Sequence, residues 1–219
     1  MATADLEPLR VELAAAAHEV ADAGLAIGTG GNISARSGEL VAISPTGAEL
    51  SELQPEQVTI IDLAGELVAG SLAPTSELDL HLGVYERYAA GAVVHTHPPI
   101  GTALSCVLHE LPCIHYQMLL LGGEVRVAPY RTFGSPELAE VTLDALEGKS
   151  AALMANHGAI AFGNDLNHAV KQSLLLEWAC GIYWTAASIG TPRALDEDAR
   201  AAVIEQAVRR NYGATREPA

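Results

Sequence analysis

The segment VVHTHPP places His95 and His97 two positions apart, after an apolar run and before a proline pair. On a β-strand, residues i and i+2 face the same side and lie about 7 Å apart along the chain. Both imidazoles can therefore converge on one metal ion, at nitrogen–metal distances of about 2.0–2.1 Å. Two hydrogen-bonded histidines near a strand end would show the same spacing, so this segment alone leaves both interpretations open.

A third candidate ligand, His157, lies in the segment ANHGA, between two apolar runs that predict strands. Gly158 allows a tight backbone turn there that is closed to other residues. The alternative is an ordinary turn histidine that faces water. Three histidines with an open fourth position are typical of a catalytic zinc site, and such an ion can polarise a carbonyl group or activate water.

The segment PTSE supplies a candidate acid or base, Glu77, next to the hydroxyl residues Thr75 and Ser76 at the start of a predicted helix. Ordinary helix capping explains the same pattern, because Thr and Ser cap helices and a glutamate is favoured by the helix dipole. The functional interpretation uses the same physics, since a helix N-terminus with two hydroxyl groups can bind a phosphate. Burial would raise the pKa of such a glutamate toward about 6–7.

Two further turns combine glycine with hydroxyl residues. The segment GTGGN (28–32) follows a predicted helix and enters a predicted strand, which is the reverse of the order in dinucleotide-binding motifs. It can still form a backbone nest for an anion. The segment SPTG (44–47) lies at the end of another predicted strand. Together with PTSE, these turns could surround one phosphate, although each alone is more often simply a turn.

The composition limits the function classes. Of the 219 residues 49% are hydrophobic, which is enough for a sizeable core, and the formal charge of −15 repels nucleic acids and anionic membranes. The only lysines, Lys149 and Lys171, do not fit a Schiff-base amine, so carbonyl activation would require a metal. Because signal-peptide and membrane-span patterns are lacking, we expect a cytoplasmic protein, whose cysteines are reduced and buried: Cys106, Cys113 and Cys180.

Helical periodicity, caps and turn residues predict one domain over residues 1–219, in which strand pairs alternate with helices. This mixture predicts a layered α/β domain with a mostly antiparallel sheet. Apolar runs predict strands that include VTIIDL, AVVHTH, IHYQML and EVRVAPY. The predicted helices cover residues 6–20, 76–88, 99–108, 135–149, 166–188 and 197–210.

In this order the segments GTGGNIS, SPTG, PTSE, VVHTHP, IHYQM, APYRTFG, NHGAIAFG and RRNYG resemble the class II aldolase/adducin family, in the branch that includes the L-fuculose-1-phosphate aldolases. The resemblance runs nearly end to end. It implies a three-layer α/β/α sandwich around a mainly antiparallel nine-stranded sheet, and a homotetramer with active sites at subunit interfaces. Residues 211–219 would form a mobile C-terminal tail.

The resemblance also implies the roles of individual residues. His95, His97 and His157 would bind one Zn²⁺ ion per subunit. Glu77 would be the acid/base residue and would contact the metal when no substrate is bound. Tyr116 of a neighbouring subunit and Tyr212 would assist at the aldehyde. The phosphate pocket would consist of Thr29, Gly31, Asn32, Thr46, Gly47, Thr75 and Ser76, with Phe133 as its aromatic lining.

The implied reaction is the reversible cleavage of a ketose 1-phosphate, L-fuculose 1-phosphate or a close 5-deoxy analogue, to dihydroxyacetone phosphate and a small aldehyde such as L-lactaldehyde. An L-ribulose-5-phosphate 4-epimerase or another sugar-phosphate lyase of the superfamily is an alternative, although epimerases typically have aspartate at the position of Glu77. A non-catalytic adducin-like interaction module is the alternative from another class.

Two positions depart from the family pattern. Thr75 replaces the first residue of a Ser-Ser pair, which keeps the hydroxyl group and adds a methyl group, so phosphate binding should persist. Asn156 replaces the first histidine of His-His-Gly. That histidine is not the metal ligand, so its loss should alter only the surroundings of the ligands.

Overall fold

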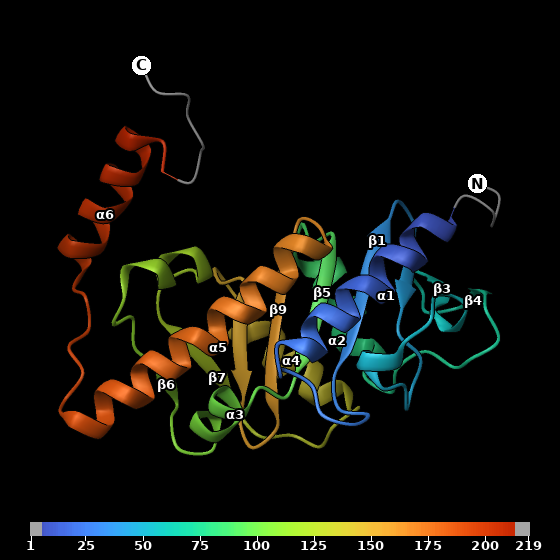
Figure 1. Cartoon of the computed structure of the whole chain (residues 1–219), viewed down its shortest axis with the longest axis horizontal. Coiled ribbons are helices and arrows are strands. Elements are labelled where there is room, and N and C mark those ends of the chain that lie inside the picture. Colours follow the sequence, from blue (N-terminus) through green and yellow to red (C-terminus); the bar gives the residue numbers. More distant parts are fainter. Residues whose placement is uncertain (1–5, 213–219) are drawn as a thin grey trace.

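The computed structural model describes residues 6–212, and a nine-stranded sheet runs through its centre (Figure 1). The strand order is β4-β3-β2-β1-β5-β9-β8-β7-β6, and all neighbours are antiparallel except β7 and β8. The strands are β1 (Asn32–Ser37), β2 (Leu40–Ile43), β3 (Thr59–Asp62), β4 (Leu67–Ala69), β5 (Ala92–Thr96), β6 (Glu110–Leu111), β7 (Val125–Ala128), β8 (Ala151–Met154) and β9 (Gly158–Gly163).

Helices cover both faces of this sheet, which confirms the three-layer α/β/α architecture. Two clusters of buried side chains separate the helices by face, one containing residues of α1 and α5 and the other residues of α2 and α4. The helices are α1 (Glu7–Asp22), α2 (Leu78–Arg87), α3 (Pro99–Ser105), α4 (Pro136–Ala145), α5 (Leu166–Ile189) and α6 (Glu197–Arg210), with short 3₁₀ helices η2 (Leu50–Glu52), η3 (Pro55–Gln57) and η4 (Tyr116–Leu121).

The central strand β5 lies between β1 and β9, and all its residues are buried. Val94 packs in the cluster with α1 and α5, whereas Val93 packs in the cluster with α2 and α4. Because side chains alternate along a strand, His95 lies on the face of the sheet that α2 and α4 cover. An apolar run that is covered on both faces thus ends in a histidine that faces α2.

The predicted strand IHYQML is wrong, since this segment forms the 3₁₀ helix η4. The side chain of His115 caps η4 by accepting a hydrogen bond from the Gln117 N–H, and Gly122 ends it in the left-handed conformation with φ of 96°. The strand predicted over EVRVAPY is confirmed but shortened to β7, and the two-residue strand β6 was not predicted. Local hydrogen bonds thus outweigh the β propensity of this apolar segment.

The C-terminal helix α6 stands beside the sandwich rather than on it (Figure 1), and none of its residues is buried. Its Arg200 pairs with Glu124, which also pairs with Lys149, so one carboxylate joins α6 to the residues around β7. The predicted mobile tail, residues 211–219, lies outside the described residues except for its first two positions.

Two sequence-based expectations concern the surface and the cysteines. Within residues 6–212, no helix is both long and apolar enough to cross a membrane. All three cysteines are free, and Cys113 and Cys180 are buried as predicted. Cys106 is exposed, so the prediction that it fills the core is wrong.

Candidate active site

Three histidines that are up to 62 positions apart in the sequence converge at one end of the central strands. His95 belongs to β5, His97 follows that strand, and His157 lies in the turn between β8 and β9. The pairing of β5 with β9 brings them together, and their ring centroids lie 4.9–5.2 Å apart. One nitrogen of each ring lies within 4.8 Å of the others, so the predicted convergence is found.

The ring of His95 has a defined tautomer. Its Nδ1 lies 2.9 Å from the backbone oxygen of Ala159, which can only accept a hydrogen bond, so Nδ1 carries the proton. Nε2 is then the nitrogen that faces the site, and it lies 3.1 Å from Nε2 of His97 and 3.1 Å from Oε2 of Glu77. A metal-binding histidine usually has this arrangement, with one nitrogen donating to a carbonyl group and the other free to coordinate.

Two glycines leave space for the ring of His97. A Cβ atom on Gly30 would lie 2.7 Å from its Nδ1, and a Cβ atom on Gly158 would lie 2.7 Å from its Cδ2 and 2.3 Å from the backbone oxygen of Thr96. Gly158 was predicted to allow a turn, but the left-handed residue of that turn is Asn156, with φ of 56°. Close packing, rather than turn geometry, therefore requires glycine at position 158.

Glu77 lies directly before α2, and its carboxylate is buried beside the histidines. Oε2 accepts a hydrogen bond from Nδ2 of Asn32 at 3.0 Å. Oε1 is buried without a hydrogen-bond partner and lies 3.5 Å from Nε2 of His157. Local capping is also present, because the hydroxyl group of Thr75 accepts a hydrogen bond from the Glu77 N–H, but the Glu77 side chain does not cap the helix.

The charges at this site favour an anionic carboxylate on Glu77 and neutral rings on two of the histidines, His97 and His157. Burial raises the pKa of Glu77, but the charge of His95 and hydrogen bonds from His95 and Asn32 outweigh burial and hold this pKa far below its usual range. The expected rise toward neutrality is therefore wrong. Burial, followed by the charges of neighbouring histidines, lowers the pKa of His97 to about 4 and also lowers that of His157.

The donor set fits a divalent cation. Neutral imidazole nitrogens and a carboxylate oxygen are preferred ligands of zinc and related transition metals. The unpartnered Oε1 of Glu77 supports this fit, because a buried carboxylate oxygen without a hydrogen bond costs about 1–3 kcal/mol or more unless another group compensates for it. A cation among these four side chains would provide that compensation.

A cavity of about 460 Å³ opens next to the histidines and is formed by the three predicted turns. The turn SPTG is held against PTSE by two backbone hydrogen bonds, from Thr46 to Ala73 and from Thr75 to Ser44. All residues predicted for the phosphate pocket line this cavity, together with Glu77, His97 and His157: Thr29, Gly31, Asn32, Thr46, Gly47, Thr75, Ser76 and Phe133.

The structure adds one cationic residue to this cavity, Arg131, which lies in the segment APYRTFG between Tyr130 and Phe133. It is the only lysine or arginine among the residues that line the cavity. Arg131 was not among the predicted phosphate ligands, because the prediction rested on the glycine- and hydroxyl-rich turns alone. The sequence does indicate Arg131 as a candidate, because basic residues are few in a chain with a formal charge of −15.

The side chain of Asn32 is already engaged, since its amide contacts both Glu77 and His81. The side chain of Asn32 therefore links Glu77 to His81 at the wall of the cavity. The sequence pattern identified the residue but not these two contacts of its side chain.

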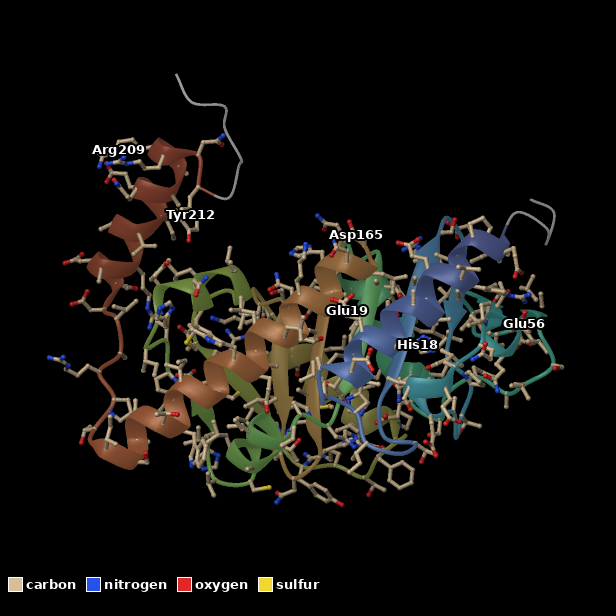
Figure 2. The ribbon with its side chains drawn as sticks, in the orientation of Figure 1. His18, Glu19, Glu56, Asp165, Arg209 and Tyr212 are labelled. Carbon is tan, nitrogen blue, oxygen red and sulfur yellow. The ribbon has the colours of Figure 1, made fainter. Side chains whose placement is uncertain are left out.

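The two predicted catalytic tyrosines lie elsewhere in the chain. The hydroxyl groups of Tyr116 and Tyr212 are 3.5 Å apart, and both residues line a second, mostly apolar cavity of about 690 Å³ between η4 and α6. The two cavities share no lining residue, and Tyr212 lies just beyond the C-terminal end of the separate helix α6 (Figure 2). Within one chain, the structure therefore does not bring the tyrosines to the histidines.

A family model described as the class II aldolase and adducin N-terminal domain matches residues 11–184. The chain is a member of the class II aldolase and adducin family. The 5-deoxy-D-ribulose 1-phosphate aldolase of Bacillus thuringiensis serovar kurstaki is 41% identical over 196 residues, which are 88% of this chain and 92% of that protein. A 5-methylthioribulose-1-phosphate/5-deoxyribulose-1-phosphate aldolase of Rhodospirillum rubrum is 39% identical over 200 residues, 90% of each chain.

Solved structures agree with this assignment. One named L-fuculose 1-phosphate aldolase superposes on this class II aldolase with a TM-score of 0.87 and 33% identity, over 94% of this chain and 97% of that one. The family and its named aldolases show that the chain is an enzyme, a carbon–carbon lyase. The alternative of a non-catalytic, adducin-like module is therefore set aside.

Proposed function

We propose that this class II aldolase reversibly cleaves a ketose 1-phosphate between C3 and C4, producing dihydroxyacetone phosphate and a short aldehyde, with Zn²⁺ as its metal. One observation carries the proposal. A cavity formed by three glycine- and hydroxyl-rich turns opens directly onto Glu77 and the histidines. A substrate with a phosphate at one end and a reacting carbon a few bonds away fits this arrangement.

The turns would bind the phosphate of the substrate. The hydroxyl groups of Thr46, Thr75 and Ser76 and the backbone around Gly31 can donate hydrogen bonds to phosphate oxygens. Arg131 supplies the positive charge that the turns lack. Binding of the phosphate at these groups would place the carbonyl end of the substrate toward the histidines.

Glu77 would move the proton at C3. When the C3–C4 bond breaks, the aldehyde leaves and an enediolate remains, which becomes dihydroxyacetone phosphate when C3 is protonated. In the synthetic direction the anionic carboxylate would remove this proton through Oε1, which has no hydrogen-bond partner, and in the cleavage direction the carboxyl group, once protonated, would return it to C3. A divalent cation held by the three imidazoles would polarise the substrate carbonyl as a Lewis acid.

The proton of the C4 hydroxyl group requires another residue. We infer that Tyr116 or Tyr212 handles it from a neighbouring subunit of a homotetramer, since within one chain these tyrosines line the second cavity. Their exposure supports this inference, because 42% of Tyr116 and 65% of Tyr212 are accessible in the single chain.

For the identity of the ketose, 5-deoxyribulose 1-phosphate is the first candidate, with acetaldehyde as the second product. Support comes from the two relatives described above, whose names include 5-deoxyribulose 1-phosphate and which are 41% and 39% identical. L-Fuculose 1-phosphate, which would release L-lactaldehyde, is the next candidate, from the 33% identical structure. The two aldehydes differ by one CHOH unit, and an added carbon or hydroxyl group in such a pocket changes binding by only about 1–3 kcal/mol, so both substrates belong in the test.

The test is a panel of ketose 1-phosphates in which dihydroxyacetone phosphate is measured through coupled NADH oxidation. The panel contains 5-deoxyribulose, 5-methylthioribulose and fuculose 1-phosphates, with L-ribulose 5-phosphate as the epimerase substrate. We expect cleavage of at least one 1-phosphate, its loss after chelation, and its recovery with Zn²⁺. Epimerisation of L-ribulose 5-phosphate without release of dihydroxyacetone phosphate would refute the proposal.

A further inference from the structure

A continuous chain of buried polar side chains leads from Glu77 into the core beneath α2. Tyr85 and Ser34 are joined through their hydroxyl groups at 2.7 Å, and the Ser34 hydroxyl lies 2.7 Å from Nδ1 of His81. Nε2 of His81 lies 2.5 Å from Oδ1 of Asn32, whose Nδ2 contacts Oε2 of Glu77 at 3.0 Å. All five residues are buried, and His81 and Ser34 are fully inaccessible.

Two regular elements build this chain. Glu77, His81 and Tyr85 are four positions apart, so they lie on one face of α2 and its N-cap. Asn32 and Ser34 are two positions apart on β1, so they face the same side of the sheet. The helix stripe packs against the strand stripe, and this match extends over two turns of the helix.

The direction of each hydrogen bond follows from the carboxylate. Glu77 is anionic and only accepts, so the amide nitrogen of Asn32 must face it and the amide oxygen must face His81. His81 then donates from Nε2 and accepts at Nδ1 from Ser34, which in turn accepts from Tyr85. Every donor in the chain therefore points toward Glu77.

The opposite tautomer of His81 would break this order. A proton on Nδ1 would leave Nε2 as an acceptor, and the amide nitrogen of Asn32 would have to turn toward it. The amide oxygen of Asn32 would then face the carboxylate of Glu77, and two acceptors would be in contact. Burial and the charge of His95 lower the pKa of His81 to about 3, so the ring is also neutral.

From this geometry we propose that His81 is a positioning residue, which acts through Asn32 to hold the carboxylate of Glu77 by Oε2 and to leave Oε1 free for proton transfer. Ser34 and Tyr85 set the tautomer of His81, because the Ser34 hydroxyl, which accepts from Tyr85, donates to Nδ1 on the side of the ring away from Asn32. The inference rests on the proposed role of Glu77. A purely structural chain would affect folding stability, whereas a positioning chain also affects turnover by a correctly folded enzyme.

The first variants act on His81 itself. His81→Phe keeps a ring in the core and removes both nitrogens, whereas His81→Gln retains an N–H group near the position of Nε2. We expect His81→Phe to lower kcat roughly 10- to 100-fold, as is typical for residues that orient a ligand from behind. KM and the metal content should change little, and His81→Gln should recover much of the loss.

A second measurement does not depend on turnover. In metal-free protein, the ¹⁵N chemical shifts of the His81 ring report which nitrogen is protonated, and we expect a proton on Nε2 in the wild type. The double variant Ser34→Ala with Tyr85→Phe removes the hydroxyl groups behind the ring, and it should lower kcat and mix the two tautomers. If His81→Phe does not fold, the double variant and His81→Gln still test the proposal.

The control is His18→Phe, the same replacement in α1. His18 is half-buried on α1, which covers the face of the sheet opposite to α2, and its Nε2 lies 3.0 Å from the backbone oxygen of Leu53 (Figure 2). Its kcat should equal that of the wild type.

The outcomes separate the inference from the proposed function. If Glu77→Gln is inactive while a folded, metal-loaded His81→Phe protein keeps its wild-type kcat, the positioning role is wrong and the function stands. If Glu77→Gln turns over normally, the role of Glu77 is wrong and the inference fails with it. A protonated Nδ1 in the wild-type protein would also overturn the inference.

Discussion

At the scale of single residues, the two carboxylate oxygens of Glu77 have different surroundings. Oε2 accepts a hydrogen bond from Asn32, whereas Oε1 is buried and unpartnered. Leaving a buried acceptor without a partner costs about 1–3 kcal/mol, and such unsatisfied groups in native proteins call for an explanation such as a catalytic role or the binding of an ion. The asymmetry is what a residue needs if one oxygen is to be held and the other is to exchange a proton.

Gly158 is essential to the position of His97. The variant Gly158→Ala would place Cβ 2.3 Å from the backbone oxygen of Thr96 and 2.7 Å from the His97 ring. Because backbone cannot yield as a side chain can, we expect a loss of about 1–3 kcal/mol in the free energy of unfolding and weaker metal binding. Urea denaturation and metal titration measure these two effects.

Gly190→Ala is the matched control. This glycine has no atom within 4 Å of the added Cβ, and its φ of 172° is available to any residue. Stability and metal affinity should remain close to those of the wild type. Equal behaviour of the two alanine variants would show that the close packing at position 158 has no consequence.

Arg131 is expected to attract and hold the substrate phosphate. The variant Arg131→Ala should raise KM for the ketose 1-phosphate roughly tenfold, the effect of losing one charge-assisted hydrogen bond of about 1.5 kcal/mol. The KM of Arg131→Lys should lie between those of the wild type and Arg131→Ala. In both variants kcat should change less than KM. Initial rates at low and high salt measure this effect, because salt screens the charge of Arg131 and should reduce the difference in KM between the wild type and the variant.

Arg193→Ala removes the same charge from an exposed arginine that does not line the cavity. If this control raises KM as much as Arg131→Ala does, the effect is one of overall charge rather than of contact with the phosphate.

At the scale of elements, η4 and α6 depart most from the sandwich. Glu124, which lies between η4 and β7, fixes α6 to this part of the chain, since its Oε1 contacts Lys149 at 2.5 Å and its Oε2 contacts Arg200 of α6 at 2.5 Å. Arg200 also donates to the backbone oxygen of Leu195, at the approach to α6. One carboxylate thus orients a helix that has no buried residue of its own.

The variant Glu124→Gln should loosen α6. Without the charge on Glu124, the ion pairs with Lys149 and Arg200 are lost, and we expect faster amide hydrogen exchange and earlier proteolysis over 197–210. Metal content should not change. Arg87→Gln, which removes the exposed pair with Asp144, is the control and should leave exchange in α6 unaltered. Unchanged exchange in Glu124→Gln would show that other contacts hold the helix.

At the scale of the whole molecule, buried neutral histidines couple stability to pH. His81 has a pKa of about 3 when folded, against an ordinary value of 6.5. Below pH 6.5 the unfolded chain binds a proton that the folded chain does not, so this contribution is present above pH 6.5 and is lost as the pH falls toward 3. The protein should therefore be less stable at pH 5 than at pH 7.

This pH dependence can be assigned to His81 by comparison with His81→Gln. We expect the wild type, with a chelator present, to lose about 2 kcal/mol more than the variant between pH 7 and pH 5, from 1.36 kcal/mol per pH unit. Urea unfolding at both pH values provides the measurement. Identical losses in the two proteins would mean that His81 is not kept neutral by the fold.

The outer surface predicts association between copies of the chain. Large apolar side chains are exposed on α5, η4 and α6, including Trp184, Ile189, Leu120 and Val208. Contiguous apolar surface usually marks an interface, and the proposed catalytic tyrosines lie beside it. Sedimentation should give a mass near four times 22.8 kDa.

A composite active site can be tested by mixing subunits. Glu77→Gln and a variant with both Tyr116→Phe and Tyr212→Phe should each be nearly inactive. If the tyrosines serve a neighbouring subunit, mixed oligomers contain some sites with both groups intact, and activity should rise above that of either parent. Mixtures that stay at the parental level would show that the tyrosines do not serve the active site of a neighbouring subunit.

The sequence by itself determined the elements and the chemical groups of the site. Hydrophobic periodicity, caps and turn residues act over a few positions, so helices such as α4 with its Ser135 cap could be predicted. The histidines, Glu77 and the turns of the cavity were identified from their types and order. IHYQML was misjudged because its apolar pattern fits a strand, whereas local hydrogen bonds make it η4.

Only the tertiary structure decided which groups meet. The pairing of β5 with β9 and the packing of α2 on β1 join residues far apart in the chain, and such non-local contacts leave no local signal. They turn His81 toward Asn32, require glycine at position 158 and place Arg131 in the cavity. The chemistry is thus carried by residue type, and its geometry by long-range packing.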